Sequence, residues 1–410
     1  MREMKDSGIE WIGEIPADWS MKRVKHIFTR KNEKAMQQNP TILSLARDGV
    51  KVRDISNNEG QIAESYYNYN PVEEGDLLLN PMDLYSGANC SISKVQGVIS
   101  PAYINLKANA GVNPAFYDYY FKVQYWLMAF FSYGKGVSYD NRWTLSAETL
   151  MNYPVVALSY GEQCKRADYL DRKCSQIDAI IARQQEVIEK LKAYKLSKIN
   201  EIVVEVEGIT AHLGYVANMK NGLNFNVVPD GKTLKFLGVG DFKDHYVLNS
   251  EEMFSDILVN DEITSEYMLQ SGDIIFVRSN GSRELVGRAV MVENVTFPLS
   301  YSGFCIRFRN LRTDILNSKY LLYFFRSPYF RKQLEKYSQG SNITNINQVL
   351  LSQISIIIPP FEVQLEAIRK VEKLLAAIDK LITGKQEIVS ALERYKKSLI
   401  YEVVTGKKEV

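Results

Sequence analysis

The sequence predicts an α+β protein in which two globular α/β domains are separated by a pair of long antiparallel coiled-coil helices. Three observations lead to this prediction. A helical segment occurs twice at an offset of 201 residues, each copy carries a narrow apolar stripe, and the segments before the two copies share turns and strands in the same order. A chain of 410 residues is long enough to form more than one core.

The repeated helix is the clearest of these features. Residues 177–203 read "IDAIIARQQEVIEKLKAYKLSKINEIV", and residues 378–404 read "IDKLITGKQEIVSALERYKKSLIYEVV". A dozen positions are identical without a gap. A match of this quality at one fixed offset indicates a tandem duplication.

Each copy carries the apolar stripe of a coiled coil, with steps of four and three residues. The expected seam residues are Leu170, Ile177, Ile181, Gln184, Ile188 and Leu191 in the first copy, and Val371, Ile378, Ile382, Lys385, Val389 and Leu392 in the second. One polar residue interrupts both seams at the same place, and polar seam residues commonly fix register. We therefore expect antiparallel pairing with an intramolecular pseudo-twofold axis near Gln184 and Lys385. The alternative is two separate amphipathic helices, each packed on its own domain.

The two helices divide the chain into four parts. We expect a first globular domain over residues 1–157, a central long helix over 158–207, a second globular domain over 208–358 and a C-terminal long helix over 359–410. Ser159 with Glu162 three residues later forms a capping box at the first helix start. Pro359 and Pro360 end a strand just before the second helix begins.

The two globular domains share their turns and helices. "EEGDLLLN" (Glu73–Asn80) corresponds to "QSGDIIFV" (Gln270–Val277), and both place a Gly-Asp turn before an apolar strand. Each domain also contains an aromatic amphipathic segment, over residues 114–131 and 318–334, that we expect to form one helix of the core.

Composition limits the class of protein. The net charge is only +2, so any nucleic-acid binding must depend on local patches. None of the four cysteines forms a C-x-x-C pair and the three histidines are scattered, so we expect no disulfide framework, no metal site and no cofactor. No signal-peptide pattern opens the chain, and no apolar run is long enough to span a bilayer. We expect a cytoplasmic protein without a membrane partner.

The loops of both domains offer side chains that suit DNA. A twofold-related pair of domains matches the symmetry of duplex DNA. Arginine reads guanine, asparagine reads adenine, and lysine and serine hold phosphate. The candidates in the first domain are Arg30, Lys31, Lys34, Arg47, Lys51, Arg53, Lys135, Ser138, Tyr139, Asn141 and Arg142. The candidates in the second domain are Lys220, Asn224, Arg278, Asn280, Ser282, Arg283, Arg288, Ser341, Asn342, Thr344 and Asn345. Each of these side chains is also what an ordinary solvated surface offers.

The chain has the order domain, helix, domain, helix, and four phrases accompany this order. They are "SGIEWIGEIPADWSMKRVK" (Ser7–Lys25), "LGYVANMKNGLNFN" (Leu213–Asn226), "GDIIFVRSNGSRELVGR" (Gly272–Arg288) and "IPPFEVQ" (Ile358–Gln364). With them, the chain resembles the specificity subunit of type I restriction-modification systems over essentially its whole length. The second domain departs from the pattern because it lacks its own copy of "SGIEWIGEIPADW".

The resemblance implies two target-recognition domains, each reading one half of a bipartite sequence in double-stranded DNA. It implies that the helices space the halves and dock two methyltransferase subunits, which restriction-translocase subunits can join. It also implies that the chain has no catalysis of its own and directs the activities of its partners.

Two other functions stay open at this stage. Asp230, Asp241 and Lys243 resemble a nuclease pattern, in which two carboxylates hold Mg²⁺ and a lysine supports the attacking water. A coiled-coil scaffold that binds no DNA is the second alternative. "NPMD" (Asn80–Asp83) lacks the second proline and the aromatic residue of amino-methyltransferases, and no G-x-x-x-x-G-K-[ST] occurs. We therefore expect neither methyl transfer nor ATP use by this chain.

Overall fold

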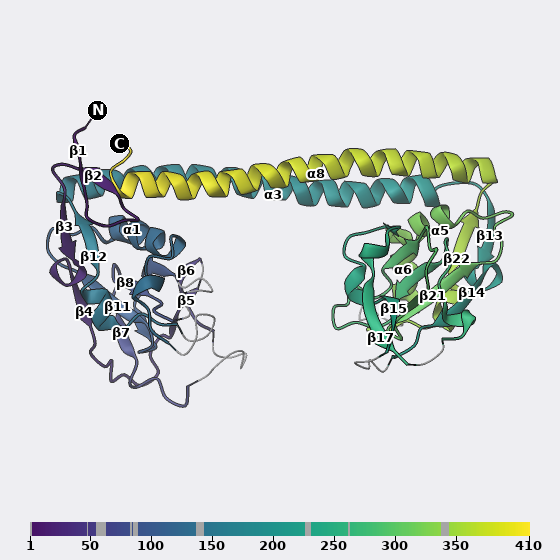
Figure 1. Ribbon diagram of the computed structural model, residues 1–410, viewed down its shortest axis with the longest axis horizontal. Helices are drawn as coiled ribbons and strands as arrows, with labels where there is room; N and C mark the ends of the chain where they lie inside the picture. The colour runs from purple at the N-terminus through teal and green to yellow at the C-terminus, as the bar shows by residue number, and fades with distance from the viewer. Residues whose placement is uncertain are drawn as a thin grey trace. The chain divides into compact units, whose positions relative to one another are not determined.

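The computed structural model describes residues 2–46, 48–54, 63–82, 84, 89–136, 143–225, 231–260, 263–337 and 344–410. The chain forms two compact units, unit 1 (Met1–Arg183 with Glu387–Val410) and unit 2 (Gln184–Gln386). The boundary falls inside both long helices, α3 (Tyr160–Val204) and α8 (Phe361–Val404), so each unit contains the beginning of one helix and the end of the other. The expected α+β fold with a packed helix pair is confirmed (Figure 1).

Before α3, the described part of unit 1 consists of short antiparallel strands and two α-helices. Its elements before α3 are β1 (Met4–Asp6), β2 (Glu14–Pro16), β3 (Ser20–Arg23), β4 (Phe28–Lys31), β5 (Leu43–Ala46), β6 (Gly49–Val52), β7 (Asn70–Val72), β8 (Leu77–Leu79), β9 (Cys90–Ile92), β10 (Gly97–Ile99), β11 (Ile104–Ala108), α1 (Pro114–Trp126), α2 (Ala147–Met151) and β12 (Pro154–Ala157). Among the described residues, the largest sheet has the order β4-β11-β8-β9, and the other strands pair as β1-β2, β3-β12, β5-β6 and β7-β10.

Unit 2 has a larger sheet, and its strands form both antiparallel and parallel pairs. Its elements between the long helices are β13 (Ile209–His212), α4 (Leu213–Val216), β14 (Ala217–Asn221), β15 (Lys232–Leu237), β16 (Val247–Leu248), β17 (Ser255–Val259), β18 (Ile274–Val277), β19 (Ala289–Val292), β20 (Leu299–Tyr301), β21 (Cys305–Asn310), α5 (Ser318–Phe325), α6 (Pro328–Tyr337), α7 (Gln348–Gln353) and β22 (Ser355–Ile358). Within the described ranges, the sheets have the orders β14-β21-β18-β19-β16, β17-β15-β20 and β13-β22.

The aromatic helices are shorter than the sequence predicts. Residues 318–334 form two helices because Pro328 cannot continue α5 and instead opens α6 at its first position. Helix α1 ends at Trp126, and Met128 follows in the left-handed conformation with φ 57°. Both α1 and α5 lie in their unit's core, where Tyr117 and Tyr320 are fully buried.

A buried glutamine joins the start of each long helix to its globular domain. In unit 2, the Gln364 side chain accepts from the Asn317 N–H at 2.9 Å and donates to the carbonyls of Ile315 and Pro359 at 2.8 Å. In unit 1, Gln163, 201 residues earlier, accepts from the Asn113 N–H at 2.8 Å. Asn113 and Asn317 are the N-cap residues of α1 and α5. One amide therefore fixes the beginning of two helices in each unit.

Both globular cores are closed by the long helices. In unit 1, Leu170 and Ile177 of α3 and Leu399 and Val403 of α8 are buried in one apolar cluster with α1. In unit 2, the corresponding cluster contains the end of α3 and the beginning of α8, with Val371 fully buried. The long helices are thus part of both cores.

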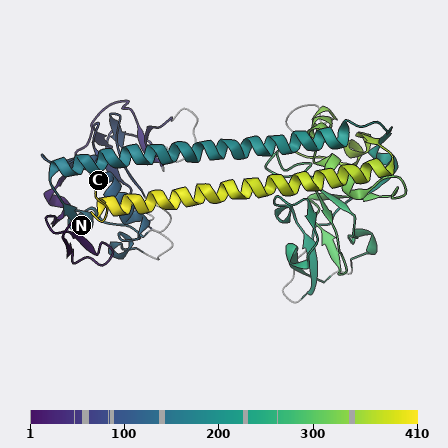
Figure 2. The ribbon, with the colours of Figure 1, turned by 90° about the horizontal axis from the view of Figure 1, so that it is seen from above.

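The long helices lie side by side and antiparallel within each unit (Figures 1 and 2). In unit 1, the Lys396 Nζ lies 2.6 Å from the Asp178 carboxylate. In unit 2, the Lys195 Nζ lies 2.7 Å from the Asp379 carboxylate. The offset of 201 residues relates the two pairs, so the same contact is made twice.

The expected seam residues are all buried or half-buried, and Leu170 and Val371 have no exposed surface. Gln184 is half-buried, and its side-chain oxygen has no hydrogen-bond partner among the residues that the structure describes. The meeting of Gln184 with Lys385 at a pseudo-twofold axis stays a prediction.

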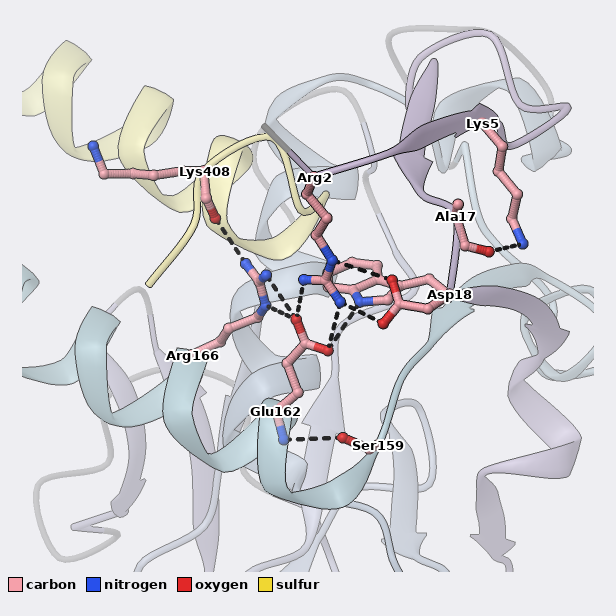
Figure 3. A network of polar contacts seen from close by, with 9 residues as sticks. Arg2, Lys5, Ala17, Asp18, Ser159, Glu162, Arg166 and Lys408 are labelled. Atoms are coloured by element: carbon pink, nitrogen blue, oxygen red, sulfur yellow. Dashed lines mark hydrogen bonds and ion pairs between the residues drawn. The ribbon is translucent and has the colours of Figure 1, made fainter.

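A polar network surrounds the first turn of α3 in unit 1 (Figure 3). Ser159 accepts from the Glu162 N–H at 3.3 Å, as one half of a capping box requires. The other half of a capping box would be a hydrogen bond from the Ser159 N–H to the Glu162 carboxylate. Among the described residues, this carboxylate instead accepts from Arg2 at 2.6 Å, from Arg166 at 2.8 Å and from the Trp19 indole at 3.1 Å. Partial burial alone would raise the pKa of Glu162, but these hydrogen bonds outweigh it and lower the pKa to about 2.

Replacing Gln364 by leucine should destabilise unit 2. The Gln364→Leu variant keeps the volume but leaves one buried N–H and two carbonyls without partners, which costs roughly 2–5 kcal/mol. Urea unfolding followed by circular dichroism measures the change, and Gln386→Leu, at an exposed position of α8, is the matched control. Equal midpoints for the two variants would contradict a role of this amide in the joint.

The stability of unit 1 should depend on the charge of Glu162. Since its pKa is lowered from 4.5 to about 2 in the folded state, the ionised carboxylate contributes stability above about pH 4.5, and this contribution is lost as the pH falls toward 2. We expect Glu162→Gln to lower the melting temperature at pH 7 by roughly 2–6 °C. Melting curves of both proteins between pH 3 and 8 should show the difference shrinking toward the acid end. A difference that stays constant over this range would be evidence against the ion pairs.

Candidate nucleic-acid interface

In unit 2, several of the expected DNA-contacting residues lie together where the buried strand β18 ends. The Arg278 N–H donates to the Phe304 carbonyl at 2.7 Å, and the Arg278 carbonyl accepts from the Ile346 N–H at 2.9 Å. The Arg278 side chain is half-buried and donates to the Gly303 carbonyl at 3.4 Å. The loop after β18 is thus held between two other loops.

Two asparagines lie beside Arg278 in this arrangement. Asn345 pairs with Ser279 in an isolated antiparallel bridge. Gly303 donates its N–H to the Leu223 carbonyl at 2.8 Å. A Cβ at Gly303 would lie 2.4 Å from the Asn224 side-chain oxygen, so any other residue here would displace the Asn224 amide. We call the convergent loops, residues 222–225, 278–283, 302–304 and 344–346, the unit 2 loop cluster.

The other candidates of unit 2 are placed differently. Asn280 accepts from the Ser282 N–H at 2.8 Å and so shapes the loop itself. Lys220 pairs with Glu266 and lies 4.1 Å from the Tyr267 ring centre. Arg288 donates to the Lys243 carbonyl. The backbone carbonyl of Arg283 accepts from Arg331 at 3.2 Å, and Thr344 is exposed. Ser341 and Asn342 lie outside the described residues.

Lys31 of unit 1 contributes to the fold. Its ammonium lies 2.8 Å from Asp76, and only 11% of its side chain is exposed. Burial alone would lower the pKa of Lys31, but Asp76 and Glu73 outweigh this effect and raise it. Asp273 of unit 2 has the same environment as Asp76, since it is buried and pairs with Arg309 at 2.6 Å.

These two aspartates explain the repeated Gly-Asp turn. Asp76 accepts from the Glu73 N–H and Asp273 from the Gln270 N–H, each at 2.8 Å. The preceding glycines have φ values of 89° and 93°, which favour glycine. The turn is therefore a structural device of both units.

The remaining candidates of unit 1 are dispersed. Arg30 is exposed and lies 3.5 Å from the Asn32 side chain, and Lys34 lies 3.3 Å from Asn70. Lys51 pairs with Asp48 at the surface, and Lys135 forms backbone hydrogen bonds with Thr144. The Arg53 N–H donates to the Ile42 carbonyl at 2.8 Å. Arg47, Ser138, Tyr139, Asn141 and Arg142 lie outside the described residues.

The nuclease pattern is used for folding. Asp241 accepts from the Gly238 N–H at 2.7 Å and from the Ser255 hydroxyl at 3.0 Å, so both of its oxygens hold a local turn. Lys243 is in the left-handed region with φ 38°, and Asp230 lies outside the described residues. Among the residues that the structure describes, no group of three His, Cys, Asp or Glu side chains could hold a metal ion.

The long helices carry a second apolar stripe that the sequence analysis missed. Its members are spaced by seven residues on both helices, as Ile180, Val187 and Tyr194 on α3 and Leu381, Ile388 and Tyr395 on α8. Five of them are 45–55% exposed, and Val187 is half-buried. These positions flank the seam, where two-stranded coiled coils carry charged residues. A wider apolar face is typical of helices that pack against further helices.

Phe304 also escaped the sequence analysis. It is 58% exposed and contacts Arg278 through the backbone. The only signal in the sequence is an aromatic residue after Ser302 and Gly303. No helix in the described part of the chain is long and apolar enough to cross a membrane.

Comparisons with known proteins agree with these features. A family model described as "Type I restriction modification DNA specificity domain" matches residues 230–394. The chain is 26% identical over 333 residues to the type I restriction enzyme StySPI specificity subunit of Salmonella potsdam, covering 77% of this chain and 66% of that protein. It is 27% identical over 263 residues to the EcoKI specificity subunit of Escherichia coli K12, covering 60% of this chain and 54% of that protein. The chain thus matches at most about two thirds of the length of these two relatives.

Another relative and two solved structures match nearly the whole chain. The MjaVIII specificity subunit of Methanocaldococcus jannaschii is 23% identical over 429 residues, covering 96% of this chain and 93% of that protein. A chain from a structure on complex assembly of the type I restriction-modification system has a TM-score of 0.73 at 14% identity, covering 96% and 99%. The HsdS subunit of Thermoanaerobacter tengcongensis has a TM-score of 0.51 at 14% identity, covering 96% and 98%. At this identity, the two structures show a shared fold.

The chain combines two α+β units with a packed helix pair, and unit 2 carries a convergent loop cluster. The family model, the curated relatives and the shared fold all make the chain similar to the specificity subunits of type I restriction-modification systems.

Proposed function

We propose that this chain is the DNA sequence-specificity subunit of a type I restriction-modification complex. Each globular domain reads one half of a bipartite target in double-stranded DNA, and the long helices set the distance between the halves. The chain itself is not catalytic. It directs two methyltransferase subunits and, in the full complex, restriction-translocase subunits, and it works in the cytoplasm.

One observation carries the proposal: the two units share the same supporting contacts, which we call the frame, but differ in their loops. Both units use the same buried glutamine, the same Gly-Asp turn and the same ion pair between the long helices. The segments that follow the equivalent strands β8 and β18 differ, because "NPMD" occupies one and "RSNG" the other. A protein that reads two different half-sites needs the same structural support in both domains but different side chains at the DNA contacts.

The unit 2 loop cluster supports base reading by arginine and asparagine. Arg278 directly follows four fully buried residues, so the core holds its Cα. Among the described residues, its guanidinium makes one long hydrogen bond. An arginine whose Cα is fixed and whose guanidinium is only weakly bound can form the paired hydrogen bonds that guanine accepts.

The second apolar stripe supports two docking surfaces for partner helices. The stripe occurs once on α3 and once on α8 at positions related by 201 residues. Exposed Tyr194 and Tyr395 are 50% and 55% accessible, and aromatic residues are enriched at protein interfaces. A duplicated stripe suits two copies of one partner.

Methylation mapping with the methyltransferase partner tests the proposal. We expect the complex to modify one bipartite sequence with an unread spacer. The Arg278→Ala variant should relax the sequence of one half-site, by roughly 5- to 100-fold in relative methylation of the altered sites. Arg312→Ala, which removes an exposed arginine outside the loop cluster of the same unit, is the control. Sequence-blind modification by the unaltered chain would refute the proposed function, and equal relaxation of both halves would refute modular reading.

Charged substitutions in the second stripe should remove partner subunits one at a time. Glutamate at Leu381 and Tyr395 should leave a complex with one methyltransferase copy in place of two, because an exposed apolar contact on α8 is lost. Glutamate at Ile180 and Tyr194 should remove the copy bound along α3. Mass photometry counts the copies, and Ser390→Glu at an exposed position beside the stripe is the control. Two copies in both double variants would exclude these surfaces as docking sites.

A further inference from the structure

Residues 36–40 form a loop of unit 1 that the candidates above do not include. It follows β4 and lies along residues 64–69. The Ala35 N–H donates to the Tyr69 carbonyl at 2.8 Å, and the Met36 N–H donates to the Tyr67 carbonyl at 3.1 Å. These two backbone hydrogen bonds anchor the loop at its beginning.

The backbone of this loop is strained at two positions. Met36 and Asn39 have φ values of 52° and 54°, in the left-handed region that side chains rarely adopt. Met36 is also 58% exposed, so burial of its side chain does not account for the conformation. Strained backbone of this kind is concentrated at functional sites, where the surrounding contacts hold it.

The loop forms one wall of an open cavity of about 640 Å³. Three consecutive amide residues, Gln37, Gln38 and Asn39, line the cavity together with Tyr66 and Tyr67. Tyr66 packs edge-on against Tyr69 with ring centres 5.1 Å apart, so its ring is held by an aromatic neighbour. The Tyr66 hydroxyl is buried and has no hydrogen-bond partner among the described residues.

The three amides are available for a ligand. All three residues are exposed, and the part of the chain that the structure describes gives none of their side chains a hydrogen bond. Each amide presents a donor and an acceptor side by side, which matches the N6 and N7 edge of adenine. Glu64 also lines the cavity, and a carboxylate accepts from cytosine N4.

The neighbouring cations complement this arrangement. Lys34 and Arg30 precede the loop and are exposed, where they can hold phosphates on either side of a base contact. Lys31 between them pairs with buried Asp76 and fixes the end of β4. The loop therefore leaves a rigid strand close to two phosphate-binding side chains.

We propose that Gln37, Gln38 and Asn39 are the base-reading residues of unit 1 and that they read an adenine in the major groove, with Tyr66 and Tyr67 lining the same cavity. This inference rests on the proposed function. It means that the two units read their half-sites with different chemical groups, because unit 1 uses amides and unit 2 uses an arginine.

The test maps methylation in cells that express the chain with its methyltransferase partner. The Gln37→Ala/Gln38→Ala double variant should accept other bases at an adenine position of one half-site, raising their relative methylation roughly 5- to 100-fold. Asn39→Gly removes the third amide while allowing the left-handed backbone. Gln38→Glu replaces the donor by an acceptor and should shift the preference toward cytosine. Gln96→Ala, at an exposed glutamine outside the cavity, should leave the target unchanged.

Each outcome has one meaning. If the unaltered chain gives no bipartite target, the proposed function fails. If it does, and the amide variants behave like Gln96→Ala, only this inference fails. Relaxation in the half-site that Arg278→Ala affects would overturn the assignment to unit 1. The amide variants could also lose methylation equally at all sequences, with an unchanged melting temperature and intact assembly. That result would overturn base reading by these residues.

Discussion

The structure depends on the burial of two helix ends in each globular core. The beginning of α3 and the end of α8 complete the core of unit 1, and the end of α3 and the beginning of α8 complete that of unit 2. A single buried glutamine then fixes each helix beginning to the N-cap of the aromatic helix. Because core and helix share the same apolar contacts, neither can turn against the other without exposing them.

The duplication separates what must stay the same from what must differ. Contacts that hold the frame are repeated almost atom for atom, as the pairs Asp178–Lys396 and Asp379–Lys195 demonstrate. The loops that leave this frame are free to change because they contribute little to either core. Unit 1 presents amides and tyrosines beside its strands, whereas unit 2 presents Arg278 with asparagines. A recognition site made of two parts requires a constant frame and loops that differ between the parts.

The sequence predicts the fold well because periodicity is a local signal. The offset of 201 residues and the seven-residue spacing are enough by themselves to indicate the helix pair. The break at Pro328 was also readable from the sequence, since proline cannot continue a helix, yet the aromatic pattern on both sides suggested one helix. The site was harder to predict. Lys31 appears as an ordinary surface lysine, and only tertiary contacts with Asp76 reveal its structural role. Conversely, Gln37 and Gln38 carry no motif, and their importance appears only from the cavity and the strained backbone around them.

Unit 1 is made of two separate stretches of the chain, and this limits when its core can form during synthesis. Unit 2 is one continuous stretch of chain, and a ribosome has delivered all of it once Gln386 has emerged. Unit 1 needs residues 387–410, because Leu399 and Val403 fill its core. Until those residues arrive, Leu170 and Ile177 lack the part of their apolar cluster that α8 supplies. Unit 1 therefore cannot complete its core before all of unit 2 has been synthesised.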